Sequence, residues 1–169
     1  MENKANSLIG APHILSLDIA TNTGFAIYEN GIITKYGLWK LDKQCRYNRR
    51  NGLSEYIKQI IDQYKITVII AEDIFFNPKK PKAYSALKEL QKVLKVVCQQ
   101  TDIPLELITP IDAKRSTTGN SVAFKEQVVS VINSYGYDLG TVKVDDIADA
   151  ISIMLTYLKR YYLPITHPK

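Results

Sequence analysis

Apolar residues recur along the chain with two different periods, and these periods predict strands first and helices afterwards. Short runs rich in β-branched and aromatic residues indicate three strands near the beginning, and the second and third are joined by Asn30-Gly31, a strong hairpin signal. Two later runs indicate two more strands, the first of them apolar throughout, as in a strand buried on both faces. The five expected strands are 13–17, 24–29, 31–41, 67–71 and 105–109.

Apolar residues spaced three and four apart indicate helices between and after these strands. The four expected helices are 47–64, 83–99, 124–135 and 145–161. The resulting order, βββ-α-β-α-β-α-α, predicts a mixed α/β fold in which three antiparallel strands and then two parallel ones form a five-stranded sheet flanked by helices. In the second helix the apolar stripe of Leu87, Leu90 and Leu94 is either ordinary core or a dimer seam, and it is our candidate for the seam.

The length and composition are those of an ordinary globular protein. With 169 residues, 46% of them hydrophobic and 23% charged, we expect a single domain over 1–169 with its core at about 13–160, and we exclude extensive disorder. Neither a secretory signal nor a membrane-spanning apolar run is recognisable, so we expect a cytoplasmic protein without a membrane partner. Cys45 and Cys98 lack the spacing of a zinc or redox site and are expected to be reduced and structural.

The charge of the chain fits a polyanionic partner. Lys and Arg number 22 against 17 Asp and Glu, which gives a net charge of +5. The basic residues gather in two stretches, although each of these could also be a solvated face. The stretches contain Lys35, Lys40, Lys43, Arg46, Arg49 and Arg50, and then Lys79, Lys80, Lys82, Lys88, Lys92 and Lys95.

Four carboxylates lie at the ends of expected strands and on the last helix, beside apolar residues that should be buried. Asp18 and Glu72 follow the first and the central strand, and Asp146 and Asp149 share one face of the last helix. Buried carboxylates need cations or protons, and two Mg²⁺ ions held by such oxygens can hydrolyse a phosphodiester. The alternative is that the strand-end acids cap turns. The Asp145-Asp146 pair would then only cap the start of the last helix and interact favourably with its dipole.

The residues around these acids resemble a known family. The segments Leu15-Ser16-Leu17-Asp18, Ile70-Ala71-Glu72 and Asp146-Ile147-Ala148-Asp149-Ala150 are similar in order, spacing and flanking residues to the acidic tetrad of the RuvC-type Holliday-junction resolvases, within the RNase H-like superfamily. These resolvases also carry a lysine after the fifth strand and another eleven residues later, which Lys114 and Lys125 match here. The resemblance covers roughly 14–158.

The resemblance implies an RNase H-like fold and an endonuclease that resolves branched DNA by paired nicks, leaving 5′ phosphates. It implies that the four carboxylates bind two Mg²⁺ ions, which Mn²⁺ can replace, and Asp145 is a further candidate ligand. It also implies that Lys114 and Lys125 act in catalysis. Phe75, three residues after Glu72, is implied to stack on a base, although core packing remains the alternative for it. A homodimer is expected because a four-way junction has two symmetric strands to cut. The implied DNA-binding residues are Phe75, Phe76, Lys79, Lys80, Lys82, Lys114, Arg115 and Lys125.

The first motif departs from the family pattern and leaves alternatives open. Many members have Gly-Ile-Asp-Pro-Gly where this chain has Ser16-Leu17-Asp18-Ile19-Ala20, which suggests a divergent bacteriophage branch acting in the cytoplasm of a bacterial host. The segment 17–24 also resembles the first phosphate loop of actin-like and sugar-kinase phosphotransferases, but these need a second such loop and an adenosine-binding subdomain. A nuclease acting on forks, flaps or RNA–DNA hybrids, and a non-catalytic module that binds branched DNA, also stay open.

Overall fold

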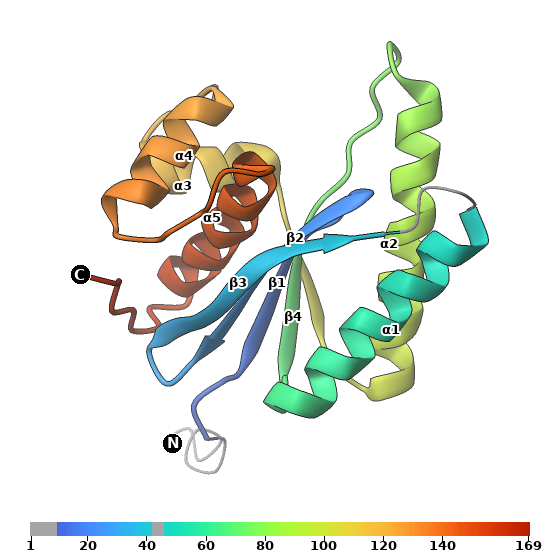
Figure 1. Cartoon of the computed structure of the whole chain (residues 1–169), viewed down its shortest axis with the longest axis horizontal. Helices are drawn as coiled ribbons and strands as arrows, with labels where there is room; N and C mark the ends of the chain where they lie inside the picture. Colours follow the sequence, from blue (N-terminus) through green and yellow to red (C-terminus); the bar gives the residue numbers. More distant parts are fainter. Residues whose placement is uncertain (1–9, 42–45) are drawn as a thin grey trace, which may run out of the picture.

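A five-stranded mixed sheet forms the centre of the molecule (Figure 1). The computed structural model describes residues 10–41 and 46–169. The strand order β3-β2-β1-β4-β5, with antiparallel pairing in the first three strands and parallel pairing of β1 with β4 and β4 with β5, confirms the predicted sheet. Asn30 and Gly31 both adopt positive φ, as the predicted hairpin turn requires. The strands are β1 (Ile14–Asp18), β2 (Asn22–Glu29), β3 (Ile32–Lys40), β4 (Val68–Glu72) and β5 (Leu105–Ile108).

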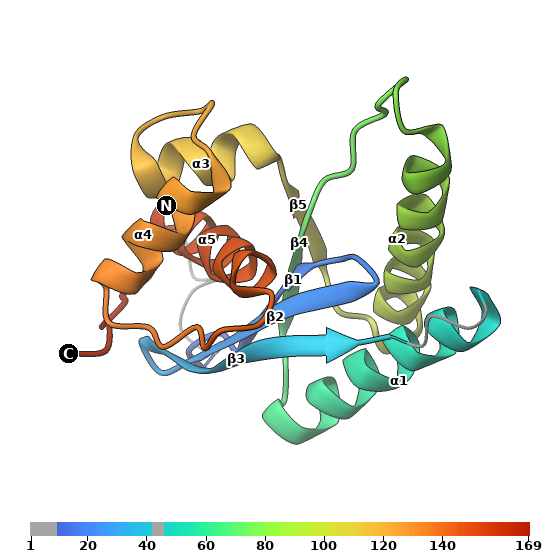
Figure 2. The same ribbon diagram turned by 45° about the horizontal axis from the view of Figure 1, so that its top comes forward.

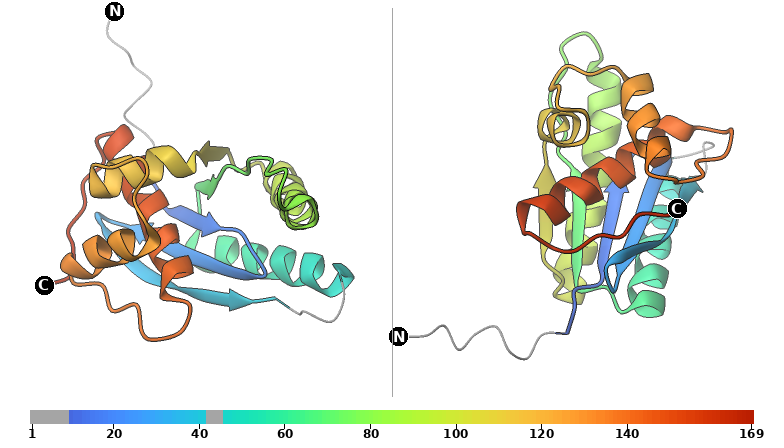
Figure 3. Two further views of the ribbon diagram at one scale, coloured as in Figure 1. Left: turned by 90° about the horizontal axis from the view of Figure 1, so that it is seen from above. Right: turned by 90° about the vertical axis from the view of Figure 1, so that its left-hand side faces the viewer.

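Helices cover both faces of the sheet and enclose two separate apolar cores. Successive residues of a strand point to opposite faces, so Leu15 and Leu17 pack with α1 and α2, whereas Ile14 packs on the side of α5. Figure 3 shows α3 and α4 on the α5 side, away from α1 and α2. The helices are α1 (Arg46–Tyr64), α2 (Pro81–Thr101), α3 (Pro110–Thr118), α4 (Lys125–Ser134) and α5 (Val144–Arg160).

Helix α3 was not expected from the sequence. It begins with the Thr109 side chain accepting a hydrogen bond from the Asp112 backbone N–H at 3.1 Å and with Pro110 in the first turn, and it ends at Gly119 in the left-handed conformation. These are ordinary start and stop signals. The helix has nine residues, and only Ala113 is fully buried, so no apolar period marks it.

The candidate dimer seam is wrong for two of its three residues. Leu94 is completely buried and Leu90 is 5% exposed, and both pack against the sheet within one chain. They therefore have no surface left for a second copy, while Leu87 is partly buried near the carboxyl ends of the strands. Cys98 is free and buried, as expected. Lys43, Cys45 and the side chain of Arg46 lie outside the described residues.

The helices of the fold are shorter or more polar than membrane-spanning ones. Among the residues that the structure describes, no helix is long and apolar enough to cross a membrane.

Candidate active site

A cleft of about 630 Å³ opens at the carboxyl ends of β1 and β4. One wall comes from α3, α5 and the start of α4, and the other comes from the segment after β4, which includes Ile74, Phe75 and Asn77. Figure 2 shows these two walls rising on opposite sides of the strand ends. A sheet of this topology therefore presents its strand-end side chains at the bottom of the cleft.

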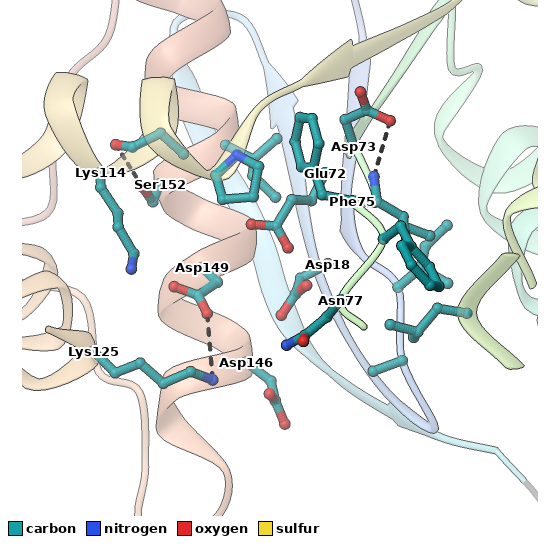
Figure 4. A pocket seen from close by; sticks show the side chains of 18 of the residues that line it. Asp18, Glu72, Asp73, Phe75, Asn77, Lys114, Lys125, Asp146, Asp149 and Ser152 are labelled. Atoms are coloured by element: carbon teal, nitrogen blue, oxygen red, sulfur yellow. Dashed lines mark hydrogen bonds and ion pairs between the residues drawn. The ribbon is translucent and has the colours of Figure 1, made fainter. Parts of the chain in front are cut away.

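The bottom of the cleft is formed by four carboxylates, here named the acidic floor: Asp18, Glu72, Asp146 and Asp149 (Figure 4). Asp18 is the last residue of β1 and Glu72 the last of β4, and both aspartates of α5 face the same cleft, so the structure brings together all four predicted carboxylates. Leu17 and Ala71, which directly precede Asp18 and Glu72 in their strands, are completely buried. The floor is thus fixed by the packing of the core beneath it.

The floor carboxylates resist ionisation together. Burial raises the pKa of Glu72 to about 7, and the negative charge of Asp149 adds to this shift. Burial likewise raises the pKa of Asp149 to about 6, with contributions from the other aspartates of α5. The pKa of Asp18 is raised well above its usual range by burial and then by the charge of Glu72. A cation entering the cleft would relieve these costs, because opposite charge favours the ionised form.

Asp145 and Asp146 have different surroundings. Lys125 Nζ contacts Asp145 Oδ2 at 3.0 Å and Asp149 Oδ2 at 3.8 Å. The hydrogen bond from Lys125 lowers the pKa of Asp145, whereas burial and the neighbouring Asp145 charge raise that of Asp146. Asp146 lines the cleft and Asp145 does not. The geometry therefore favours Asp146 as the fourth member of the floor.

Gly24 of β2 determines how closely the start of α5 approaches the sheet. It pairs with Asp18 across β1 and β2, and a Cβ atom built on it would lie 1.9 Å from the carbonyl oxygen of Asp146. No side chain fits at such a distance, so any substitution must move the first turn of α5 away from the sheet. Sequence analysis missed this residue, because a glycine in a strand does not reveal that a distant helix touches it.

Two buried serines fix α5 just after Asp149. The Ser16 hydroxyl of β1 donates a hydrogen bond to the carbonyl oxygen of Ala150. The Ser152 hydroxyl donates to the carbonyl oxygen of Ala113 in α3 at 3.2 Å and lies 2.6 Å from the hydroxyl oxygen of Thr117. These bonds hold α5 against both β1 and α3. Sequence analysis missed both serines, which resemble any other small residue within an apolar run.

The sequence profile described as Crossover junction endodeoxyribonuclease RuvC matches residues 16–157, the segment that contains the whole acidic floor. The chain belongs to the RuvC family. It is 31% identical over 149 residues to the crossover junction endodeoxyribonuclease RuvC of Campylobacter concisus, covering 85% of this chain and 94% of that protein. It is 26% identical over 133 residues to the RuvC of Dictyoglomus thermophilum, covering 79% of this chain and 80% of that protein.

Solved structures of a bacterial RuvC and of a viral resolvase have the same fold. The structure titled "T. thermophilus RuvC in complex with Holliday junction substrate" superposes with a TM-score of 0.76 at 16% identity, over 90% of this chain and 98% of that one. A Fowlpox virus resolvase in complex with Holliday junction DNA superposes with a TM-score of 0.54 at 20% identity, over 88% of this chain and 98% of that one. The mixed sheet with its flanking helices is therefore the RuvC fold.

The donor atoms of the floor in this RuvC-family chain suit a hard divalent cation. All four side chains offer carboxylate oxygens, which Mg²⁺ and Mn²⁺ prefer. Within residues 10–41 and 46–169, no three His, Cys, Asp or Glu side chains converge as tightly as a bound ion requires. Burial, with a smaller contribution from the neighbouring negative charges, raises the pKa values of Glu72 and Asp149, and a bound cation would favour their ionised forms.

The two lysines predicted for the site both line the cleft. Partial burial lowers the pKa of the Lys125 ammonium, but its contacts with Asp145 and Asp149 more than reverse this effect, and the pKa is raised overall. Lys125 is therefore charged at neutral pH. Arg115 lies apart from the residues that line the cleft, and its Nη1 atom pairs with Asp112 Oδ1 at 3.5 Å.

The remaining predicted DNA-binding residues follow β4 and form what we call the basic rim: Phe75, Phe76, Lys79, Lys80 and Lys82. Phe75 is 59% exposed and Phe76 60% exposed, so the core-packing alternative for Phe75 is wrong. The ring of Phe76 meets that of Tyr84 edge-on at 5.1 Å, which ties the rim to α2. The three lysines are exposed, beyond the part of the rim that lines the cleft.

Proposed function

We propose that this protein is a metal-dependent endonuclease that resolves Holliday junctions by paired hydrolysis of phosphodiester bonds, leaving 5′ phosphates. The observation that carries the proposal is the acidic floor, in which four carboxylates from three elements line one cleft of a RuvC-family chain. The match to the RuvC family extends from β1 to α5 and so includes all four carboxylates. We expect the enzyme to act in the cytoplasm, that of a bacterial host if the protein is encoded by a bacteriophage.

The proposed metal ligands are the carboxylates of the floor, with Mg²⁺ as the expected ion and Mn²⁺ as a substitute. When bound, two such ions supply an activated water and stabilise charge on the leaving 3′ oxygen. At neutral pH the metal-free floor keeps part of its protons, since the pKa values of Glu72 and Asp149 are about 7 and 6. Metal loading must displace these protons, so activity should rise with pH over this range.

The cations around the floor are proposed to hold the DNA. Lys114 and Lys125 line the cleft beside the carboxylates and can neutralise the phosphates on either side of the bond that is cut. The basic rim adds three exposed lysines and two exposed rings on the opposite wall. Exposed rings stack on bases only where these are unpaired, which favours the branch point of a junction over an intact duplex.

A homodimer is proposed on symmetry. A four-way junction presents two equivalent strands, and two copies related by a twofold axis would place one floor on each of them. Sedimentation at micromolar concentration should give the mass of two chains. A monomer that still cuts both strands of a junction in one encounter would contradict this assembly.

The function is tested by cleavage of a labelled synthetic four-way junction with Mg²⁺ and with EDTA, beside duplex, fork, flap and RNA–DNA hybrid substrates. We expect paired nicks on opposing strands, products that a ligase reseals, and no cleavage in EDTA. Equal cutting of forks and flaps would broaden the function to general removal of DNA branches. Junction binding without cleavage would replace the enzyme with a binding module, and the absence of both would overturn the proposal.

A further inference from the structure

Two strongly exposed apolar residues precede Lys125, which lines the cleft on the side opposite the basic rim. The loop between α3 and α4 carries Val122, which is 76% exposed, and Phe124, which is 74% exposed. Ala123 between them is 1% exposed and anchors the loop in the core. Single exposed apolar residues are common on protein surfaces, so the meaning of these two depends on how they are held and on what surrounds them.

The backbone of this loop is fixed by hydrogen bonds. Its turn is closed by the Asn120 side chain, which accepts from the Val122 N–H at 3.0 Å, and by the Asn120 carbonyl, which accepts from Ala123 at 3.2 Å. The Phe124 N–H donates to Gln127 Oε1 at 2.8 Å. The ring is therefore presented outward by an ordered segment, which lowers the entropic cost of contact with a ligand.

The side chain of Phe124 cannot cap the helix that begins at this residue. It is the N-cap of α4, where Ser, Thr, Asp or Asn is preferred because an oxygen can accept a hydrogen bond from the first turn. A phenyl ring offers no such oxygen, and its exposure means that it contributes little to the core. A residue that serves neither the helix nor the core is a candidate for contact with a partner.

The surroundings of Phe124 are those of the proposed DNA site. The next residue, Lys125, lines the cleft and contacts Asp149 of the floor. Figures 1 and 2 show the α3–α4 loop and the segment after β4 rising on opposite sides of the carboxyl ends of the strands. Phe75 lines the cleft, and Phe124 directly precedes Lys125 of the opposite wall, although Phe124 is not itself among the residues that line the cleft.

We propose that Phe124, supported by Val122, stacks on an unpaired nucleobase of the DNA held in the cleft, so that the branch point is gripped by aromatic rings from both walls. This inference rests on the proposed function and specifies how that site selects its substrate. An intact duplex offers no free base face to Phe124. The contact therefore adds selectivity for branched DNA and little general affinity.

The test is equilibrium binding of Phe124→Ala to a four-way junction and to a duplex of the same length, in EDTA to prevent cleavage. We expect junction affinity to fall about tenfold, the order expected for one lost stacking contact, with an unchanged salt dependence and an unchanged duplex affinity. Phe124→Tyr should keep the junction affinity, and Phe124→Leu should lose it, because a leucine is apolar but has no flat face. A 2-aminopurine base at the branch point should be quenched by the parent protein and less so by Phe124→Ala.

Tyr162, which is 94% exposed just beyond the far end of α5, provides the matched control. Tyr162→Ala removes an even more exposed ring at the far end of α5 and should leave junction binding unchanged. If the parent protein prefers the junction and Phe124→Ala binds it within twofold of the parent, this inference is wrong and the proposed function stands. If the parent itself binds junction and duplex alike, the proposed function fails and the inference fails with it.

Discussion

The acidic floor and the basic rim face the same cleft, but they are built in opposite ways. In the floor, Asp18 and Glu72 each directly follow a completely buried residue, Leu17 and Ala71 respectively. The rim residues Phe75 and Phe76 are more than half exposed and belong to a segment without regular secondary structure. Changes in the floor should therefore alter the chemical step, whereas changes in the rim should alter DNA binding and leave the fold intact.

The largest effect is expected in the floor, from Asp18→Asn. The variant keeps the size of the side chain but removes a charge that a metal ion would need, and we expect cleavage of a junction to fall at least about 1000-fold. Junction binding in EDTA should stay close to that of the parent protein, because phosphates are contacted by cations. Comparing single-turnover cleavage with equilibrium binding separates the two quantities. Cleavage at the parental rate would remove Asp18 from the floor.

The next largest effect should come from Gly24→Ala, because the added atom would meet the backbone of the floor residue Asp146. An added Cβ atom would displace Asp146 on α5, and a shift of about 1 Å near reacting groups can slow a reaction roughly 100-fold. Gly37→Ala is the matched control in the same sheet, since there the new atom meets only the Phe25 ring, at 3.2 Å. If both variants cut at equal rates and melt at equal temperatures, Gly24 does not position the floor.

The contrast between floor and rim also explains which features the sequence predicts. Asp18 and Glu72 were placed correctly because strand-end residues of neighbouring parallel strands must meet at one edge of the sheet. The spacing of Asp146 and Asp149 placed both on one helix face. The exposure of Phe75 was left open, because a single aromatic residue after a strand has no period that would assign it to the core or to the surface.

What the sequence did not predict depends on contacts between distant segments. Gly24 matters because α5, more than a hundred residues later, lies against it, and no local pattern contains that information. Leu90 and Leu94 were assigned to a dimer seam because an apolar stripe does not say whether it packs on its own sheet or on a second chain. Helix α3 was missed because only Ala113 of its nine residues is fully buried.

A smaller effect is expected in the rim from replacing Lys79, Lys80 and Lys82 by glutamine. Each lost phosphate contact lowers the slope of log affinity against log salt by about 0.9, so the slope should fall by up to about 3, with a loss of affinity of roughly tenfold at moderate salt. The cleavage rate of bound junction should stay within about twofold of the parent rate. Gel-shift titrations at several salt concentrations measure the slope. Lys58→Gln together with Lys65→Gln, on and just after α1, is the matched control and should change neither quantity.

The last effect concerns the stability of the metal-free protein and not its activity, and of the two regions only the floor should produce it. Folding raises the pKa of Glu72 from 4.5 to about 7 and that of Asp149 from 3.8 to about 6, so the folded state binds these protons more tightly than the unfolded state. The stabilisation is complete below the unfolded pKa values and is lost as pH rises through about 6 to 7, which makes the protein in EDTA about 4 kcal/mol less stable at about pH 8 than at about pH 5.

Urea unfolding in EDTA at the two pH values measures this difference, and Mg²⁺ should restore more stability at the higher pH than at the lower. The double variant Glu72→Gln with Asp149→Asn should flatten the pH dependence, because its floor has two fewer carboxylates to ionise, whereas the triple lysine variant of the rim should retain it. If the double variant keeps the full pH dependence, that dependence arises elsewhere in the molecule. The floor would then lose its main physical reason for binding a divalent cation.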